Sequence, residues 1–240
     1  MLIGEDYAKI SFEFMGLEWL EPMAILTNLL MCSVALFAFI RLKNRGGKSG
    51  SETAWRSFFL LYVLAGFTSA FSHGLYNYIG FAGKIPAWGF GVLSVMVLEM
   101  IMLYTLKPGN KMLSGFSVIK AATVLTLAFS GEFFLPVAIN AVLGLLVIVA
   151  PLAMKFTRNG IPGYRNVWLG VSLLIPAAVL YLGKINPHPW MNKDDVSHIL
   201  MAITIYLFYK SAYAILPATS SPMAEATATP IPPKPTADKQ

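Results

Sequence analysis

Charged residues are scarce in this chain. Asp, Glu, Lys and Arg make up 12% of its 240 residues, about half of their share in an ordinary soluble domain. Hydrophobic residues make up 56%. This balance argues against an ordinary soluble domain and is typical of a chain that folds in a lipid bilayer. The only cysteine, Cys32, excludes a disulfide within the chain.

The few charges that are present are unevenly distributed between apolar stretches. Ten of the cationic residues fall in the first, third and fifth connections, and the acidic residues gather near the N-terminus. Loops rich in Lys and Arg stay on the cytoplasmic side of a membrane. We therefore expect the N-terminus outside and the C-terminus inside. This topology accounts for the net charge of +6 without a nucleic-acid partner.

Seven stretches are apolar enough and, at about 20 residues, long enough to cross a hydrocarbon core about 30 Å thick. In hydrocarbon such stretches must pair their own backbone groups, so they are helices. The sequence predicts an all-α, seven-transmembrane helix bundle over residues 1–216, in the plasma (inner) membrane of a bacterium, followed by a disordered cytoplasmic tail over 217–240. The predicted spans are 22–42, 57–80, 86–106, 114–131, 133–154, 166–184 and 194–216.

Two histidines lie inside these spans, where ionisable side chains are costly and commonly mark a site. His73, in "GFTSAFSHGLYNY", is expected about 7 residues, or ~10 Å, below an outer helix end near Gly80. His198, in "DDVSHILMAITIYLFYK", is expected about one turn below the outer end of the last span. Ser69 and Asp194 each precede a histidine by four residues and share its helical face.

This spacing is compatible with a metal site. Asp194 and His198 at i and i+4 present two ligands on one face, and His73 from another helix would make three, as in a catalytic zinc centre with an open position. Two simpler interpretations remain. His73 would be a neutral imidazole bonded to Ser69 or to a carbonyl. Asp194 or Asp195 would merely cap the last helix.

Three motifs resemble one known group of proteins. "GFTSAFSHGLY", "LEPMAILTNLL" and "DDVSHILMAITIYLFY" are similar to the second-, first- and seventh-span motifs of the alkaline ceramidase and adiponectin-receptor-like superfamily of seven-helix membrane hydrolases. The resemblance implies that fold with the N-terminus outside. It implies zinc as cofactor, held by His73, His198 and Asp194, the last standing where the family has another histidine. It also implies that Ser69 lies beside the metal.

The third span departs from the family pattern, because "GKIPAWGFGVL" has no Asp to orient a metal-bound water. Either Asp195 or Glu21 takes that role, or the protein is not catalytic. Both acids have a plainer interpretation, since each lies at the start of a helix, where a negative charge is stabilising.

Two functions follow from the resemblance and the residues together. The first is zinc-dependent hydrolysis of a lipid amide or ester, ceramide-like by resemblance, with Ser69 hydrogen-bonding the oxyanion and Asp195 or Glu21 as general base. The second is a non-catalytic lipid-binding or sensor protein of the same fold. The partners expected in both cases are membrane lipids. A retinal-type protein is rejected because Lys210 lies too far toward the inner end of its span.

A few other polar and aromatic residues suit two interpretations. Glu99, at membrane depth, either pairs with Lys120 or marks a proton pathway. His188, between two prolines, is expected to be exposed on a loop. Aromatic residues near the outer end either shape a pocket or form an interfacial belt. These are Trp19, Tyr76, Tyr78, Trp88 and Trp190.

Overall fold

The computed structural model describes residues 1–216, and within them seven helical spans are long and apolar enough to cross a membrane. Six spans centre on one helix each, and the fifth joins α6 (Leu135–Ala141), a π-helix η2 (Val142–Val149) and α7 (Ala150–Arg158). The predicted all-helical multi-pass bundle is confirmed. The single-helix spans are α1 (Pro22–Lys43), α2 (Gly50–Gly74), α4 (Lys84–Leu106), α5 (Lys111–Gly131), α8 (Tyr164–Leu182) and α9 (Lys193–Ile215).

The second span differs from its predicted bounds at both ends. It begins at Gly50 because the Ser49 hydroxyl accepts the Glu52 amide and the Glu52 carboxylate accepts the Ser49 amide, a capping box. It ends at Gly74, after which a single turn, α3 (Tyr76–Ile79), and a 3-10 helix, η1 (Gly80–Gly83), lead into α4. His73 therefore lies in the last turn of α2, nearer the helix end than the predicted boundary near Gly80 placed it.

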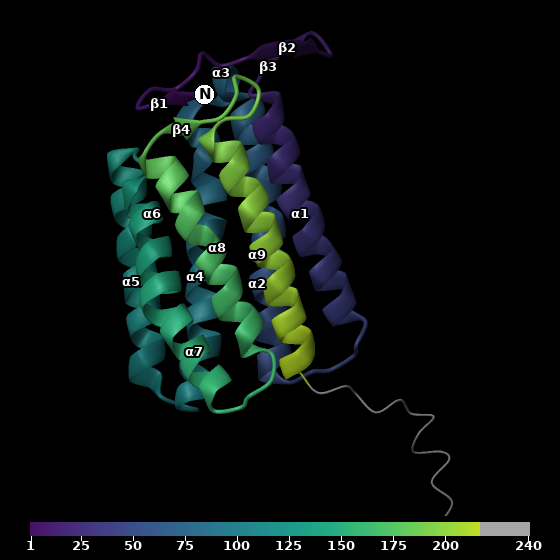
Figure 1. Cartoon of the computed structure of the whole chain (residues 1–240), viewed down its shortest axis with the longest axis vertical. Helices are drawn as coiled ribbons and strands as arrows, with labels where there is room; N and C mark the ends of the chain where they lie inside the picture. Colours follow the sequence, from purple (N-terminus) through teal and green to yellow (C-terminus); the bar gives the residue numbers. More distant parts are fainter. Residues whose placement is uncertain (217–240) are drawn as a thin grey trace, which may run out of the picture.

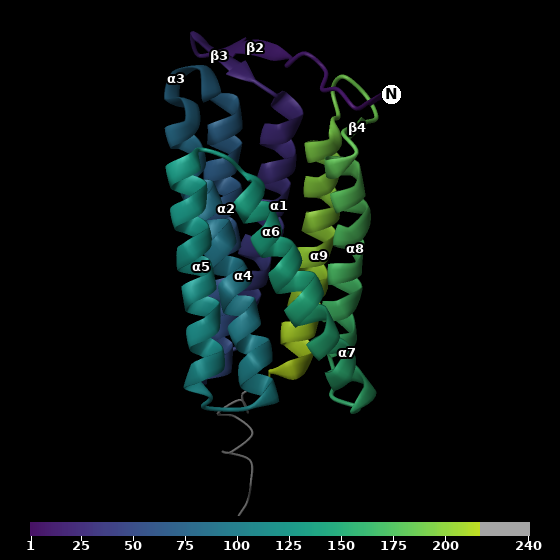
Figure 2. The same ribbon diagram turned by 90° about the vertical axis from the view of Figure 1, so that its left-hand side faces the viewer.

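The order of packing closes the bundle. α1 lies between α2 and α9, α2 also packs on α4, and α4 packs on α5 (Figures 1 and 2). α8 packs on both α7 and α9. Helices from opposite ends of the chain thus flank α1, and this brings the histidine of the second span close to that of the last.

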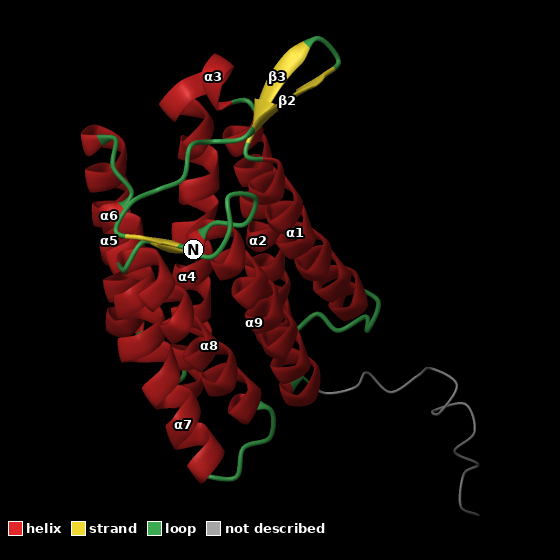
Figure 3. Ribbon diagram, turned by 45° about the horizontal axis from the view of Figure 1, so that its top comes forward, coloured by secondary structure: helices red, strands yellow, loops and turns green. Residues whose placement is uncertain are grey.

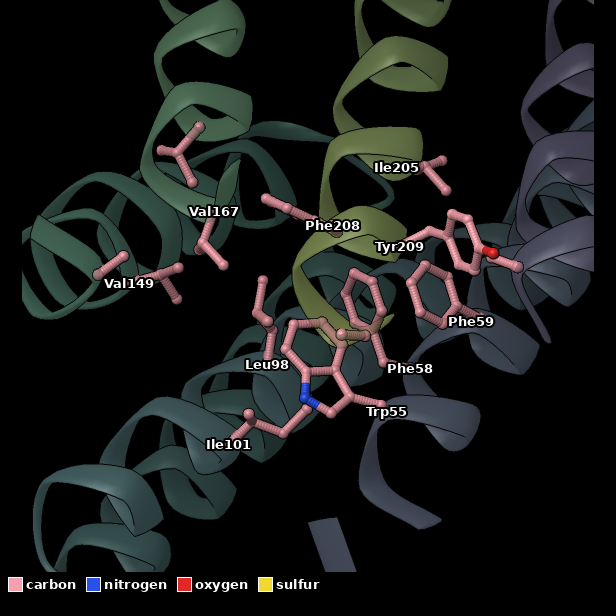
Figure 4. Packing of buried hydrophobic residues seen from close by; sticks show 14 of the residues in the cluster. Trp55, Phe58, Phe59, Leu98, Ile101, Val149, Val167, Ile205, Phe208 and Tyr209 are labelled. Carbon is pink, nitrogen blue, oxygen red and sulfur yellow. The ribbon is translucent and has the colours of Figure 1, made fainter. Parts of the chain in front are cut away.

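The main core lies between α1, α2, α4, α8 and α9, with η2 and α7 also contributing (Figure 4), and aromatic rings pack against one another in it. Phe58 meets Phe59 with ring centroids 5.1 Å apart and meets Phe208 of α9 at 5.8 Å. Nearer the site, Gly66 of α2 sets the spacing to α1, because a Cβ there would lie 3.0 Å from the Asn28 carbonyl oxygen. Small residues allow such close helix contacts in membrane proteins.

A polar cluster of Lys120, Glu99 and Asn140 lies inside the bundle. The Lys120 ammonium donates to Glu99 at 2.5 Å and to the Asn140 side-chain oxygen at 2.6 Å, joining α5, α4 and α6. The predicted pairing of Glu99 with Lys120 is therefore confirmed. Gly144 of the π-helix leaves room for the Glu99 carboxylate, since a Cβ there would lie 2.3 Å from Oε1.

Short strands cover one end of the bundle (Figures 1 and 3). β1 (Leu2–Ile3) pairs antiparallel with β4 (Ile185–Asn186), and β2 (Ser11–Phe14) pairs antiparallel with β3 (Leu17–Leu20). We call this the capped end, defined by residues 1–21 and 183–192. The Asn186 side chain donates to the Glu5 carbonyl at 2.7 Å, and Lys193 at the start of α9 pairs with Asp6. The predicted tail over 217–240 lies outside the described residues.

Candidate functional site

Glu21 connects the cap to the first transmembrane helix. It follows β3 directly and precedes Pro22, the first residue of α1, as the sequence indicated. Its backbone has φ 50° and ψ 62°, a left-handed conformation that is costly for a residue with a side chain. The Glu21 amide donates to the Ile10 carbonyl at 2.9 Å, which helps to hold this turn. Strain of this kind is often found at functional sites.

The Glu21 carboxylate binds His73. Its Oε2 lies 2.9 Å from Nδ1 of His73 and 3.1 Å from the Lys9 ammonium. Burial of Glu21 opposes ionisation, but the hydrogen bond and charge of His73, with a smaller contribution from Lys9, lower the pKa of Glu21 from 4.5 to about 2. Glu21 is therefore an anion at neutral pH, fixed against one ring nitrogen of the histidine.

His198 of α9 meets two polar side chains of α1. Its Nδ1 lies 3.1 Å from the Thr27 hydroxyl and 3.3 Å from the Asn28 amide nitrogen. The Thr27 hydroxyl donates its hydrogen to the Met23 carbonyl at 2.9 Å, so its oxygen can accept a hydrogen bond from Nδ1–H. Asn28 donates one amide hydrogen to the Ala24 carbonyl at 2.8 Å and has a second one for an unprotonated Nδ1.

These two partners favour opposite tautomers of His198. If Thr27 accepts, Nδ1 carries the proton and Nε2 has a free lone pair; if Asn28 donates, the proton is on Nε2. The balance between Thr27 and Asn28 therefore decides whether Nε2 of His198 can be a metal ligand.

The two imidazoles are brought together as the sequence predicted. Their ring centroids are 6.2 Å apart, and the ring planes are nearly perpendicular at 79°. Both Nδ1 atoms have partners from α1 or from the residue before it, whereas within residues 1–216 neither Nε2 atom makes a hydrogen bond. The described residues thus leave one ring nitrogen of each histidine without a hydrogen-bond partner.

The other expected site residues are less closely engaged. Ser69 lies one turn before His73 on α2, and its hydroxyl has no hydrogen-bond partner in the described part of the chain. Asp194 lies 3.7 Å from the Lys193 ammonium. The Asp195 carboxylate accepts a hydrogen bond from the Asn192 backbone amide at 2.8 Å, and the Asn192 side-chain oxygen accepts one from the Asp195 backbone amide. These two bonds form a capping box that starts α9.

The positions of these side chains decide whether they could hold a zinc ion. Over residues 1–216 no group of three or more His, Cys, Asp and Glu side chains is placed to hold a metal ion. The two imidazoles lie close together, but Asp194 does not complete a three-residue set with them. Asp195 has the structural role that its position suggested, because its carboxylate caps the helix.

A small pocket at the capped end reaches Glu21. It is formed between the N-terminal segment, the start of α1 and the loop before α9, and its lining includes Lys9, Glu21, Trp190 and Asp195. Trp190 is the expected aromatic residue that lines it. His188 lies on the same loop, where its Nδ1 accepts the Trp190 amide at 3.2 Å, and it takes no part in the pair of histidines.

Sequence reasoning assigned no role to Thr27, Asn28 or Lys9. The first two were visible as adjacent polar residues inside an apolar span, in "LEPMAILTNLL", and polar groups at membrane depth usually contact one another. Their partner could not be read from the sequence, because α1 and α9 are separated by most of the chain. Lys9 carries no such signal, since it lies in an irregular segment.

The bundle and its polar site define a seven-helix integral membrane protein with paired histidines near one end. Residues 23–217 match a family described as a family of unknown function, DUF6962. The chain belongs to this family. The matched region includes both histidines, Thr27 and Asn28, and it begins after Glu21 and the N-terminal strands β1, β2 and β3. No curated protein matches the chain.

Proposed function

We propose that this protein is a zinc-dependent membrane hydrolase that cleaves an amide or ester bond of a lipid. The proposal includes the orientation derived from the loop charges, with the capped end outside and the opposite end in the cytoplasm, and a location in the plasma (inner) membrane of a bacterium. It also takes up the resemblance of the first, second and seventh spans to ceramidase-like hydrolases.

One observation carries the proposal. His73 and His198 converge from different helices, each with Nδ1 occupied and Nε2 unengaged among the described residues. Metal-binding histidines commonly have this arrangement, since a carboxylate or another acceptor on one nitrogen fixes the tautomer and orients the other nitrogen toward the metal. The Glu21 carboxylate would do this for His73, and the Thr27 hydroxyl for His198.

Zinc, when bound, supplies an activated water and polarises the carbonyl of the lipid. The protein's own residues would orient His73 and donate a hydrogen bond to the substrate. Glu21 holds His73 as the tautomer protonated on Nδ1, because a carboxylate at 2.9 Å accepts a hydrogen bond from Nδ1–H. The unpaired Ser69 hydroxyl, one turn from His73, is available to donate a hydrogen bond to the developing oxyanion.

A hydrolysis assay tests the proposal. The purified chain is placed in phosphatidylcholine vesicles that contain an N-acyl sphingoid base or a diacylglycerol, and released fatty acid is measured by mass spectrometry. We expect release by the wild type and by His188→Ala, because His188 lies outside the pair of histidines. Release should be lost in His73→Ala and His198→Ala and after treatment with a metal chelator. Equal release from all four proteins would contradict the proposal.

The second candidate function is lipid binding without hydrolysis. The observation in its favour is that two histidines and no third ligand are assembled among residues 1–216. In that case Asn28 donates to Nδ1 of His198, and both imidazoles act as hydrogen-bonding groups for a lipid headgroup. The same assay separates the two functions, since a binding protein would retain its lipid intact.

A further inference from the structure

The β2–β3 hairpin has one apolar face and one acidic face. Its register places Phe12 opposite Trp19 and Phe14 opposite Leu17. The alternate pair is Glu13 opposite Glu18. Directly opposed side chains in a two-stranded sheet lie on the same face. Aromatic and aliphatic groups therefore occupy one side, and the two carboxylates lie on the other, together with Ser11 and the buried Leu20 at the base of the hairpin. Like charges in direct opposition are destabilising, which makes this an unfavourable hairpin in water alone.

The apolar face continues the surface of a transmembrane helix. Trp19 of the hairpin stacks with Phe12 at 6.5 Å and contacts Phe71 of α2 at 6.1 Å between ring centroids. Phe71 in turn contacts Phe67 at 4.9 Å, and both of these α2 rings are exposed on the outside of the bundle. An unbroken row of rings therefore runs from the membrane-spanning surface of α2 onto the hairpin.

Contacts with the end of α2 and with α3 hold the hairpin in place beside this row of rings. The Trp19 ring covers Gly74, the last residue of α2, where a Cβ would lie 2.6 Å from Cε3 of the indole. The Glu18 amide donates to the Tyr78 hydroxyl at 2.9 Å, and the Asn77 side chain donates to the Glu18 carboxylate at 3.1 Å. These contacts attach β3 to the last residue of α2 and to α3, the turn that follows it.

The outer part of the apolar face has no cover among the described residues. Phe14 is 54% exposed and Met15, at the turn, is 86% exposed. Figure 3 shows the hairpin at the edge of the capped end, beyond α1, so its tip is not folded over the bundle. Aromatic residues of this kind are favoured at the boundary between lipid headgroups and acyl chains.

We propose that the β2–β3 hairpin is a membrane-interface anchor, with Phe12, Phe14, Met15 and Leu17 inserted among the lipids of the adjacent leaflet. The row of rings sets its depth, and the acidic face with Glu13 and Glu18 stays in water. Because β3 leads directly into Glu21, contact with lipid also steadies the residue that holds His73. This anchor is independent of the hydrolase proposal, since a lipid-binding protein would need it equally.

Spin labels on the two faces test the anchor. In a Cys32→Ala background, Phe14→Cys and Glu13→Cys are labelled one at a time in nanodiscs of phosphatidylcholine. Collisions with oxygen, which concentrates in lipid, are compared with collisions with a water-soluble nickel chelate. We expect a shift toward oxygen at position 14 and toward the chelate at position 13, because adjacent strand residues point to opposite faces.

A second labelling site protects the test against local misfolding. Met15→Cys changes an exposed turn residue, so it should report the lipid side even if a label at position 14 disturbs the hairpin. Chelate-dominated collisions at both 14 and 15 would refute the anchor. Spin–spin broadening between labels on different molecules would also refute it, because it would show that a second copy covers the apolar face.

Discussion

Removal of the Glu21 carboxylate should weaken the capped end in a pH-dependent manner. Glu21 has a pKa of about 2 in the folded protein against 4.5 when unperturbed. At 1.36 kcal/mol per pKa unit, this difference corresponds to about 3 kcal/mol of folding free energy at neutral pH. The Glu21 side chain is only 11% exposed, so solvent screening reduces this contribution little.

The direction of the pH dependence follows from the lowered pKa. A carboxyl group that is more acidic when folded stabilises the protein above its unfolded pKa, and this stabilisation is lost as the pH falls through the folded pKa. We therefore expect the wild type to exceed Glu21→Gln in unfolding free energy by a constant amount down to about pH 5. The difference should then shrink progressively toward about pH 2.

Chemical denaturation in detergent micelles across this pH range measures the effect. Glu13→Gln is the matched control, because Glu13 lies on the acidic face of the hairpin opposite Glu18. Its neutralisation relieves a repulsion between like charges, so it should not lower stability at any pH. Lys9→Met should lower stability by less than about 1 kcal/mol, since exposed ion pairs contribute little. A difference between wild type and Glu21→Gln that persists undiminished below about pH 3 would refute the assigned role of the carboxylate.

Three further changes probe the frame around the site. Gly66→Leu should destabilise the bundle by about 1–3 kcal/mol in denaturation, because it forces α2 away from α1. A Cβ at Gly91 would meet no atom within 4 Å, so Gly91→Leu should cost less than Gly66→Leu. Asp195→Ala should cost about 1 kcal/mol through loss of the capping box. Fatty-acid release should then persist per folded molecule, and its complete loss would instead make Asp195 catalytic. Lys120→Met should cost about 3–5 kcal/mol because it strands Glu99 as an unpaired buried acid, and the double change with Glu99→Leu should recover much of this; additive losses would contradict the pairing.

The helices of this protein could be predicted from its sequence because the bilayer imposes a length and an apolar composition on each span. The boundaries of α2 could not, since its first turn is polar. Ser49 and Glu52 start the helix by reciprocal hydrogen bonds. Their spacing is typical of a capping box, but the predicted boundary rests on hydropathy, which does not detect a polar first turn.

The sequence predicted those features of the site that depend only on how far a residue lies from the end of its helix. Counting along two helices placed His73 and His198 near the same end, and the structure brings their rings to 6.2 Å. Counting does not say which way a side chain turns. The position of Asp195 at the start of α9 does indicate a cap, and its carboxylate caps that helix. Glu21 contacts His73 from a left-handed backbone conformation, which residue spacing does not encode.

The strands of the capped end could not be predicted from the sequence for a different reason. Strands β2 and β3 are four residues each and carry an unfavourable pair of glutamates, so their local sequence gives a weak signal for a hairpin. Their position depends on the contact of Trp19 with α2 and on that of Glu18 with α3. Tertiary contacts of this kind override local preference and are not visible in the sequence.

The central claim is that His73 and His198 share one zinc ion, and the metal content of the purified protein tests it most directly. Elemental analysis should find one zinc per chain in the wild type and in His188→Ala, and none in His73→Ala or His198→Ala, with all four proteins shown to be folded by circular dichroism. A folded wild type that binds no zinc, even after incubation with the metal, would contradict the account.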